Sequence, residues 1–112
     1  MAIDVDAAAP ILGGIYGGLS GPALHSLAVR TVYQAKAAVR IPIIGVGGIT
    51  DWRGAVEMMM AGASAVQIGT AVMYRGVEVF REITAGMSKF LHDNRYSSVS
   101  EIVGLANKPN PN

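Results

Sequence analysis

Apolar residues first recur at helical spacing in the stretch that begins at Pro22. From there to Val39 they return every three or four positions, as they do on one face of a helix. Proline suits the first turn of a helix, where its missing N–H costs no hydrogen bond. The pattern therefore predicts a helix over Pro22–Val39. The preceding residues, Met1–Gly21, follow neither a helical nor an alternating pattern and are predicted to form a loop.

Further helical patterns occupy the second half of the chain. Asp51 can cap a helix over Trp52–Gly62, because its side chain accepts a hydrogen bond from a free amide of the first turn and glycine favours the end. An amphipathic pattern predicts a long helix over Val77–Leu91. Ser98 and Glu101 have the spacing of a capping box, which indicates one more short helix.

Two short runs, Ile41–Val46 and Ala63–Ile68, consist almost entirely of apolar residues. Runs of this kind are typical of strands buried on both faces of a parallel sheet. Glycines follow each run, and a short turn is expected after Gly69 and Thr70. The order of helix, strand, helix, strand and helix predicts an α/β fold with parallel strands.

A sheet of two strands has two open edges, so strands from outside the chain are expected to complete it. The 112 residues are accordingly interpreted as one partial domain, 1–112, with a frayed tail over residues 106–112.

The composition narrows the classes of function. Hydrophobic residues make up 51% of the chain and charged residues 15%, which excludes a disordered chain and suggests surface covered by a partner. A net charge of +1 with dispersed basic residues indicates no nucleic-acid partner and no anionic membrane surface. Without cysteine there is no disulfide or thiolate metal site, and a cytoplasmic location is expected. No metal site is predicted.

Glycines gather where predicted strands end and helices begin, in the segments Gly17–Gly21, Gly45–Gly48 and Gly69–Thr70. Glycine lacks a β-carbon, so its backbone can adopt positive φ and approach an anion, while a following helix presents unpaired N–H groups. The sequence thus predicts a phosphate site made of backbone amides. A dinucleotide-binding motif does not fit, because Thr50 stands where the third glycine is required.

Three segments, Gly17–Ala23, Ile41–Ile49 and Ala61–Ala71, together resemble the C-terminal end of class 1 dihydroorotate dehydrogenases. The similarity extends from Met1 to about Leu105. That family is a (β/α)8 barrel, an architecture of about 250 residues. The resemblance implies that this chain carries only the last two βα units of a TIM barrel, as a truncated reading frame, a fragment or one piece of a split barrel.

The resemblance also implies that the chain binds FMN. One group of residues would lie against the phosphate end of the flavin: Gly18, Leu19, Ser20 and Gly21. A second group would supply amides and one hydroxyl to the phosphate: Gly47, Gly48, Gly69 and Thr70. Phosphate sites of such barrels commonly form in the loops after the seventh and eighth strands, which agrees with this assignment.

The implied reaction is the oxidation of dihydroorotate to orotate in pyrimidine biosynthesis, with two electrons passed to FMN. The family's catalytic base, its flavin-contacting lysine and its orotate-binding asparagines have no counterpart here, so no catalytic residue is assigned and the isolated chain is expected to be inactive. Dihydroorotate and orotate are expected as ligands only if the barrel is completed. The expected partners are further copies of the chain, in a homo-oligomer, or a complementing N-terminal barrel chain.

Two other functions remain open. The chain fits a phosphate-binding barrel segment of a non-flavin enzyme, because the same glycine arrangement serves many phosphorylated ligands. It also fits a non-catalytic fragment that self-associates through its open sheet edges. Among single side chains, His25 and His92 are interpreted as surface or rim residues, Met58–Met60 as core filling, and Trp52 and Tyr16 as packing residues.

Overall fold

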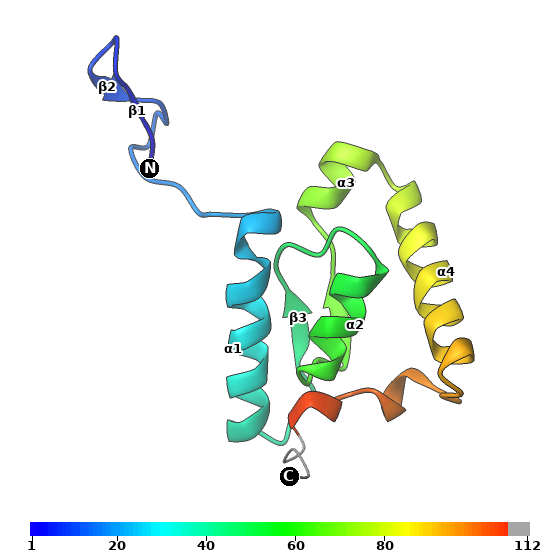
Figure 1. Cartoon of the computed structure of the whole chain (residues 1–112). Helices are drawn as coiled ribbons and strands as arrows, with labels where there is room; N and C mark the ends of the chain where they lie inside the picture. The colour runs from blue at the N-terminus through cyan, green and yellow to red at the C-terminus, as the bar shows by residue number, and fades with distance from the viewer. Residues whose placement is uncertain (108–112) are drawn as a thin grey trace.

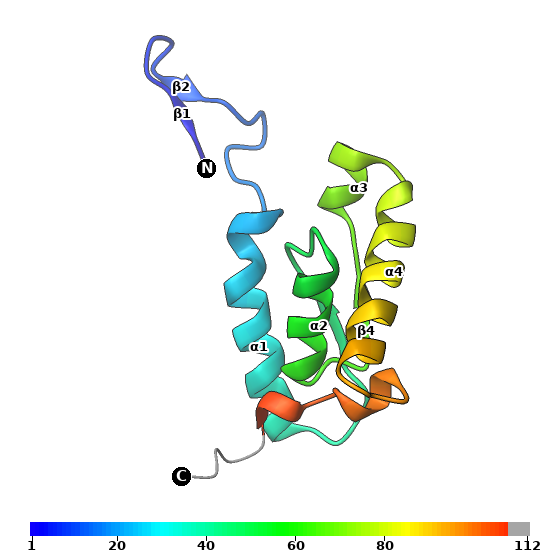
Figure 2. The ribbon, with the colours of Figure 1, turned by 45° about the vertical axis from the view of Figure 1, so that its right-hand side comes forward.

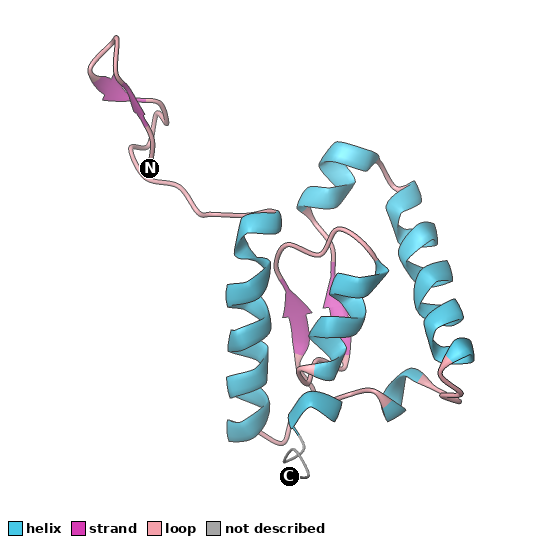
Figure 3. Cartoon of the chain, viewed as in Figure 1, coloured by secondary structure: helices cyan, strands magenta, loops and turns pink. Residues whose placement is uncertain are grey.

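Two parallel strands and the helices around them form the body of the protein (Figure 1, Figure 3). The structure is a computed structural model that describes residues 1–107. Its elements in chain order are β1 (Ile3–Asp4), β2 (Ala9–Pro10), the 3₁₀ helix η1 (Pro22–Leu24), α1 (His25–Ala38), β3 (Ile44–Val46), α2 (Trp52–Met60), β4 (Ala65–Gln67), α3 (Thr70–Arg75), α4 (Glu78–Asp93), η2 (Val99–Glu101) and η3 (Leu105–Asn107).

Strands β3 and β4 pair in parallel, with Ile44 opposite Ala65 and Val46 opposite Gln67. The connection between them is α2, so β3, α2 and β4 form one βαβ unit. Within residues 1–107 this sheet has two strands and does not close into a barrel. The predicted α/β pattern with an incomplete sheet is therefore confirmed.

The prediction that the strands are buried on both faces is wrong for one face. Gly45 is buried, whereas Ile44 and Val46 remain 57% and 51% exposed. Successive side chains of a strand point to opposite faces. One face lies under the helices, and in the described part of the chain no layer covers the other.

The main core lies between the sheet and its helices. Met58 of α2 is fully buried, and a β-carbon on Gly45 would collide with its side chain, so strand and helix approach closely at this point. Helix α2 lies between α1 and α4 (Figure 2). The fully or nearly buried residues of this core are Ala28, Val32, Ile49, Ala55, Met58, Ala61, Ala63, Ala71, Val79 and Ile83.

Helix α4 packs on α2 through aromatic contacts. The ring centroids of Trp52 and Phe90 are 5.8 Å apart, and those of Phe90 and Tyr96 are 6.2 Å apart. Gly86 permits this approach, because a β-carbon there would collide with the Trp52 ring. The interpretations of Trp52 as a packing residue and of the methionines as core filling are confirmed, since the Trp52 ring packs on Phe90 and Met58 and Met59 are buried. The same interpretation of Tyr16 is wrong, because its side chain is 77% exposed in the segment before η1.

Several element boundaries differ from the predictions. Residues Met1–Gly21 contain a short antiparallel hairpin of β1 and β2 rather than loop alone, and it stands away from the body (Figure 1). The first predicted helix divides into η1 and α1. The expected turn after Thr70 is the six-residue helix α3, which ends at Gly76 with a φ of 73°. Glycine adopts a positive φ readily and is common just after the last residue of a helix.

The capping predictions have different outcomes. The Asp51 side chain accepts a hydrogen bond from the Gly54 N–H at 3.0 Å, as expected of an N-cap. Glu101 accepts from the backbone N–H of Ser97 at 2.9 Å, so the predicted reciprocal box with Ser98 does not form. The first two residues of the predicted tail, 106–112, belong to η3, where the side-chain amide of Asn107 donates a hydrogen bond to the backbone oxygen of Ala61. Positions 108–112 lie outside the described residues.

Candidate functional site

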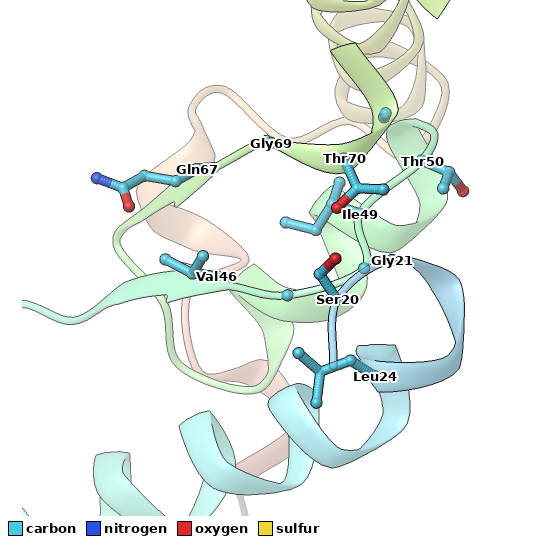
Figure 4. Close-up of a pocket in the computed structure, with 12 residues that line it drawn as sticks. Ser20, Gly21, Leu24, Val46, Ile49, Thr50, Gln67, Gly69 and Thr70 are labelled. Carbon is cyan, nitrogen blue, oxygen red and sulfur yellow. The ribbon is translucent and has the colours of Figure 1, made fainter. Parts of the chain in front are cut away.

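Three separate loops line one pocket of about 250 Å³ at the ends of β3 and β4 (Figure 4). The pocket contains six of the eight residues predicted to bind the flavin phosphate: Ser20, Gly21, Gly47, Gly48, Gly69 and Thr70. The other lining residues are Leu24, Val46, Ile49, Thr50, Gln67 and Ala71. The fold thus brings together glycine segments that are distant in sequence.

The loop after β3 and the segment before η1 touch at two glycines. Gly48 has a φ of 64°, and a β-carbon there would lie 2.6 Å from the carbonyl oxygen of Gly21. Gly21 has a φ of 84°, and its own β-carbon position lies 3.4 Å from Cγ2 of Thr70. Positive φ is readily adopted only by glycine. These two positions therefore hold the three loops at close distance around the pocket.

The pocket is more open at Gly69, in the loop after β4. A β-carbon added to Gly69 would meet no atom within 4 Å, and Gly69 precedes Thr70, the first residue of α3. The first N–H groups of a helix have no partner within the helix. Figure 4 shows the Ser20 and Thr70 side chains extending into the same space. The glycine backbone of all three loops and the hydroxyls of Ser20 and Thr70 thus line one pocket.

The side chains that line the pocket are all uncharged. An anion would be held there by amide and hydroxyl hydrogen bonds rather than by an ion pair, and no carboxylate of the lining would repel it. Among residues 1–107, no group of three or more His, Cys, Asp or Glu side chains is placed to hold a metal ion. The arrangement is suited to binding a small anionic group.

Two predicted site residues do not reach the pocket. Leu19 is 63% exposed, and a β-carbon on Gly18 would meet nothing within 4 Å. Both lie in the exposed segment between the hairpin and η1. The prediction placed Gly18 and the turn Leu19–Gly21 together against the flavin phosphate, whereas the structure brings only Ser20 and Gly21 into the pocket.

Sequence reasoning missed Gln67, the polar lining residue contributed by β4. It pairs with Val46 across the sheet, so both side chains belong to the exposed face. A polar residue two positions before Gly69, near the end of a largely apolar run, was the available signal. The nearly buried Ile49 and Ala71 form the apolar part of the lining.

His25, interpreted as a surface or rim residue, is instead held between two elements. Its side chain is 17% exposed, Nδ1 lies 2.9 Å from the oxygen of Gly47, and Nε2 lies 3.2 Å from Oε2 of Glu57. His92 is 91% exposed, as expected of a surface residue.

The sequence profile of the dihydroorotate dehydrogenase family matches residues 1–91. This chain belongs to the dihydroorotate dehydrogenase family. Members of the family are oxidoreductases and are in general flavin-dependent. The expected resemblance is confirmed, and it was carried by the same glycine segments that form the pocket.

Curated relatives show the same similarity over almost the whole chain. It is 55% identical over 108 residues to the protein named dihydroorotate dehydrogenase B (NAD(+)), catalytic subunit, from Pyrococcus abyssi, and the match covers 96% of this chain and 36% of the relative. Identity to the protein of the same name from Methanosarcina acetivorans is 50%, and the match covers 96% of this chain and 34% of that relative. The chain thus spans about a third of the length of the curated relatives it matches.

Solved dihydroorotate dehydrogenases have the same local fold. The enzyme from Eimeria tenella in complex with ferulenol superimposes with a TM-score of 0.78 and 32% identity, over 83% of this chain and 25% of the enzyme. Its ligand-free form gives the same TM-score over 26% of its chain. These neighbours are TIM barrels, so the expected fold class, a segment of such a barrel, is confirmed. None of the helices within residues 1–107 is both long and apolar enough to cross a membrane.

Proposed function

We propose that this chain forms the part of an FMN-dependent dihydroorotate dehydrogenase that holds the phosphate end of the flavin. The observation that carries the proposal is the uncharged pocket lined by Gly21, Gly47, Gly48 and Gly69. Its volume of about 250 Å³ is just below the roughly 300–1,000 Å³ of pockets that enclose a whole small ligand. The pocket is therefore suited to one end of a flavin, with the remainder lying outside it.

The residues present fit a phosphate monoester. At Gly48 and Gly69 no side chain stands between the backbone and the pocket, and Ser20 and Thr70 add hydroxyl donors. Phosphate oxygens accept hydrogen bonds from such groups without a basic side chain. In this proposal Gly18 and Leu19 have no direct part.

Bound FMN supplies the two-electron acceptor for the oxidation of dihydroorotate to orotate. The contribution of this chain is to bind and orient the phosphate end. Removing a proton from the substrate requires a general base within hydrogen-bond reach of it. The pocket lining offers no carboxylate, imidazole or amine for that role, so turnover requires groups from outside the chain.

We propose that those groups come with the strands that complete the barrel. Apolar side chains are exposed on the open sheet face and on the helices that follow β4. They are Ile44 and Val46 on β3, Met73 and Tyr74 on α3, and Phe80 on α4. Exposed apolar patches of this kind mark interaction surfaces. The proposed occupants are further copies of the chain or a complementing N-terminal barrel chain. A cytoplasmic location belongs to the same proposal, because pyrimidine synthesis is the pathway that the resemblance implies.

The test is an absorbance titration of the purified chain with FMN and, in parallel, with riboflavin, which lacks the phosphate. Retention of FMN near one per chain, with much weaker binding of riboflavin, is the expected result. Equal binding of the two flavins would contradict a phosphate site. Binding of inorganic phosphate without any uptake of FMN would favour the segment of a non-flavin enzyme.

A second candidate function is self-association without a ligand, which the exposed Ile44 and Val46 favour. Light scattering on the same samples separates it from the first. An oligomer that takes up neither FMN nor phosphate would support the non-catalytic fragment. An assembly that forms or tightens only when FMN is added would support the flavin site.

A further inference from the structure

We propose that His25 is a positioning residue for the phosphate pocket: its ring holds the peptide between Gly47 and Gly48 so that the Gly48 N–H faces the pocket. This inference rests on the proposed function and adds to it a side chain that does not line the pocket. His25 would act through the backbone rather than by touching the ligand.

The contact geometry identifies the donor. Nδ1 of His25 lies 2.9 Å from the carbonyl oxygen of Gly47, and a carbonyl oxygen can only accept a hydrogen bond. The proton in this contact is therefore on Nδ1. On the other side of the ring, Nε2 lies 3.2 Å from Oε2 of Glu57. The ring thus links the first residue of α1 to both the β3 loop and α2.

The direction of the Gly48 amide follows from peptide geometry. In a planar trans peptide the C=O and the next N–H point in opposite directions, and residues 1–107 contain no cis peptide. The Gly47 carbonyl points toward His25, which lies outside the pocket lining, while Gly47 and Gly48 both line the pocket. The Gly48 N–H is accordingly directed away from His25, toward the pocket.

The peptide between Gly47 and Gly48 is less restricted by its own residues than other peptides of the loop, so a hydrogen bond from elsewhere is needed to fix its orientation. Gly47 and Gly48 have φ values of 135° and 64°, and glycine populates both signs of φ at little cost. A peptide with glycine on both sides can therefore rotate more freely than others in the loop. The hydrogen bond from His25 favours the orientation in which the carbonyl faces α1.

The residues around the His25 ring leave space for it in this position. A β-carbon on Gly54 of α2 would lie 3.3 Å from both Cε1 and Nε2 of His25, so the missing side chain at residue 54 leaves room for the ring. A simpler role would be to link α1 to α2 through Glu57 alone. That role assigns no importance to the Gly47 contact, which makes the two roles separable by substitution.

Three substitutions at His25 separate the two contacts. His25→Asn places an amide nitrogen near the position of Nδ1 and keeps a donor for Gly47. His25→Gln places its amide near the position of Nε2 and keeps only the contact to Glu57. His25→Ala removes both, and Glu57→Gln, the matched control, leaves the Gly47 contact in place.

The first measurement is made by NMR on the ligand-free full chain. It compares the carbonyl carbon shift of Gly47 and the amide shifts of Gly48 among the variants. We expect His25→Asn and Glu57→Gln to resemble the unsubstituted chain, while His25→Ala and His25→Gln shift both signals. Unchanged Gly47 and Gly48 signals in His25→Ala would overturn the inference.

The second measurement is the dissociation constant for FMN. His25→Ala and His25→Gln are expected to weaken binding about tenfold, the effect of one hydrogen bond, and His25→Asn is expected to restore it to within about twofold. If Glu57→Gln weakened binding as much as His25→Ala, His25 would only link the helices and the inference would be wrong. If the unsubstituted chain took up no FMN, the proposed function would fail, and the ligand-free shifts would still decide the role of His25.

Discussion

The carbonyl oxygen of Gly21 lies 2.6 Å from the place where a β-carbon on Gly48 would stand. Real β-carbons essentially never come that close to another atom, and Gly48 also has a φ of 64°. The contact joins the segment before η1 to the loop after β3 at the edge of the pocket. Any side chain at residue 48 must separate these two loops.

Gly48→Ala is therefore expected to lower both stability and FMN affinity. Strain from positive φ and the clash with Gly21 should cost about 1–3 kcal/mol of unfolding free energy. Urea unfolding and FMN titration measure the two effects. Gly69→Ala is the control for stability, because its β-carbon meets nothing within 4 Å and its φ is −117°. Gly18→Ala, outside the pocket, is the control for affinity, and equal losses in it and Gly48→Ala would contradict the site.

Met58→Ala is expected to destabilise the fold through the core. The side chain is fully buried against Gly45 and Ala63, and truncation of a buried methionine to alanine typically costs about 2–5 kcal/mol. Met73, which is 87% exposed, provides the matched control. Met73→Ala should stay within about 0.5 kcal/mol. Similar midpoints of denaturation for the two variants would argue against the described core.

Asp51→Ala should weaken the start of α2. The Asp51 carboxylate accepts a hydrogen bond from the Gly54 N–H at 3.0 Å, and loss of such a cap costs about 1 kcal/mol. Asp51→Asn keeps an acceptor and should retain most of the stability. Thermal unfolding of the three proteins tests this, and an alanine variant as stable as the asparagine variant would contradict the cap.

Ile44→Lys and Val46→Lys are expected to reduce self-association. These residues are 57% and 51% exposed on the open sheet face, and a charged side chain there is costly to bury against another chain. Light scattering should give a lower mass for both variants than for the unsubstituted chain. Val5→Lys alters a residue that is 84% exposed on the N-terminal hairpin and should leave the mass unchanged. An unaltered mass in the β3 variants would place the interface elsewhere.

Lys89 donates a hydrogen bond to Asp93 at 2.7 Å, and this contact, with a smaller one from His92, lowers the pKa of the Asp93 carboxyl below its ordinary value of 3.8. A lowered folded-state pKa means that the contribution to stability is present above pH 3.8 and is lost as the pH falls through the folded pKa. Lys89→Ala is expected to move the pKa of Asp93 upward. An NMR titration of its carboxyl carbon checks this, with an unmoved midpoint contradicting the contact.

Local patterns predicted most of the helical scaffold. The cap at Asp51 and the core role of Met58 follow from residue chemistry within one or two turns, so sequence alone was enough. The extent of β3 could not be predicted from sequence alone. Strand residues such as Ile41 need a neighbouring strand to hold them, and the described chain provides only β4, on one side of β3. The capping box failed for a similar reason, since Glu101 has two nearby amides to choose from and takes that of Ser97.

The site was predictable where glycine conformation decided it. Glycine is required at residues 47 and 48 because both have positive φ and close neighbours. Their position directly after a predicted strand indicated this requirement. Gly18 could not be separated from Gly21 by sequence, because the point where the chain leaves the body depends on tertiary contacts. The bridging position of His25 depends on Gly54 and Glu57, which come from a different helix, and no local pattern contains that information.

The hairpin that stands away from the body affects how the molecule moves through solution. The radius of gyration is 17.0 Å and the principal extents are 56, 33 and 27 Å, whereas a compact chain of about this length has a radius near 13 Å. An elongated particle has more friction than a sphere of the same mass. A single copy should therefore leave a size-exclusion column early, at the volume of a heavier globular standard, and sediment slowly. Its elution volume alone would overstate the number of subunits.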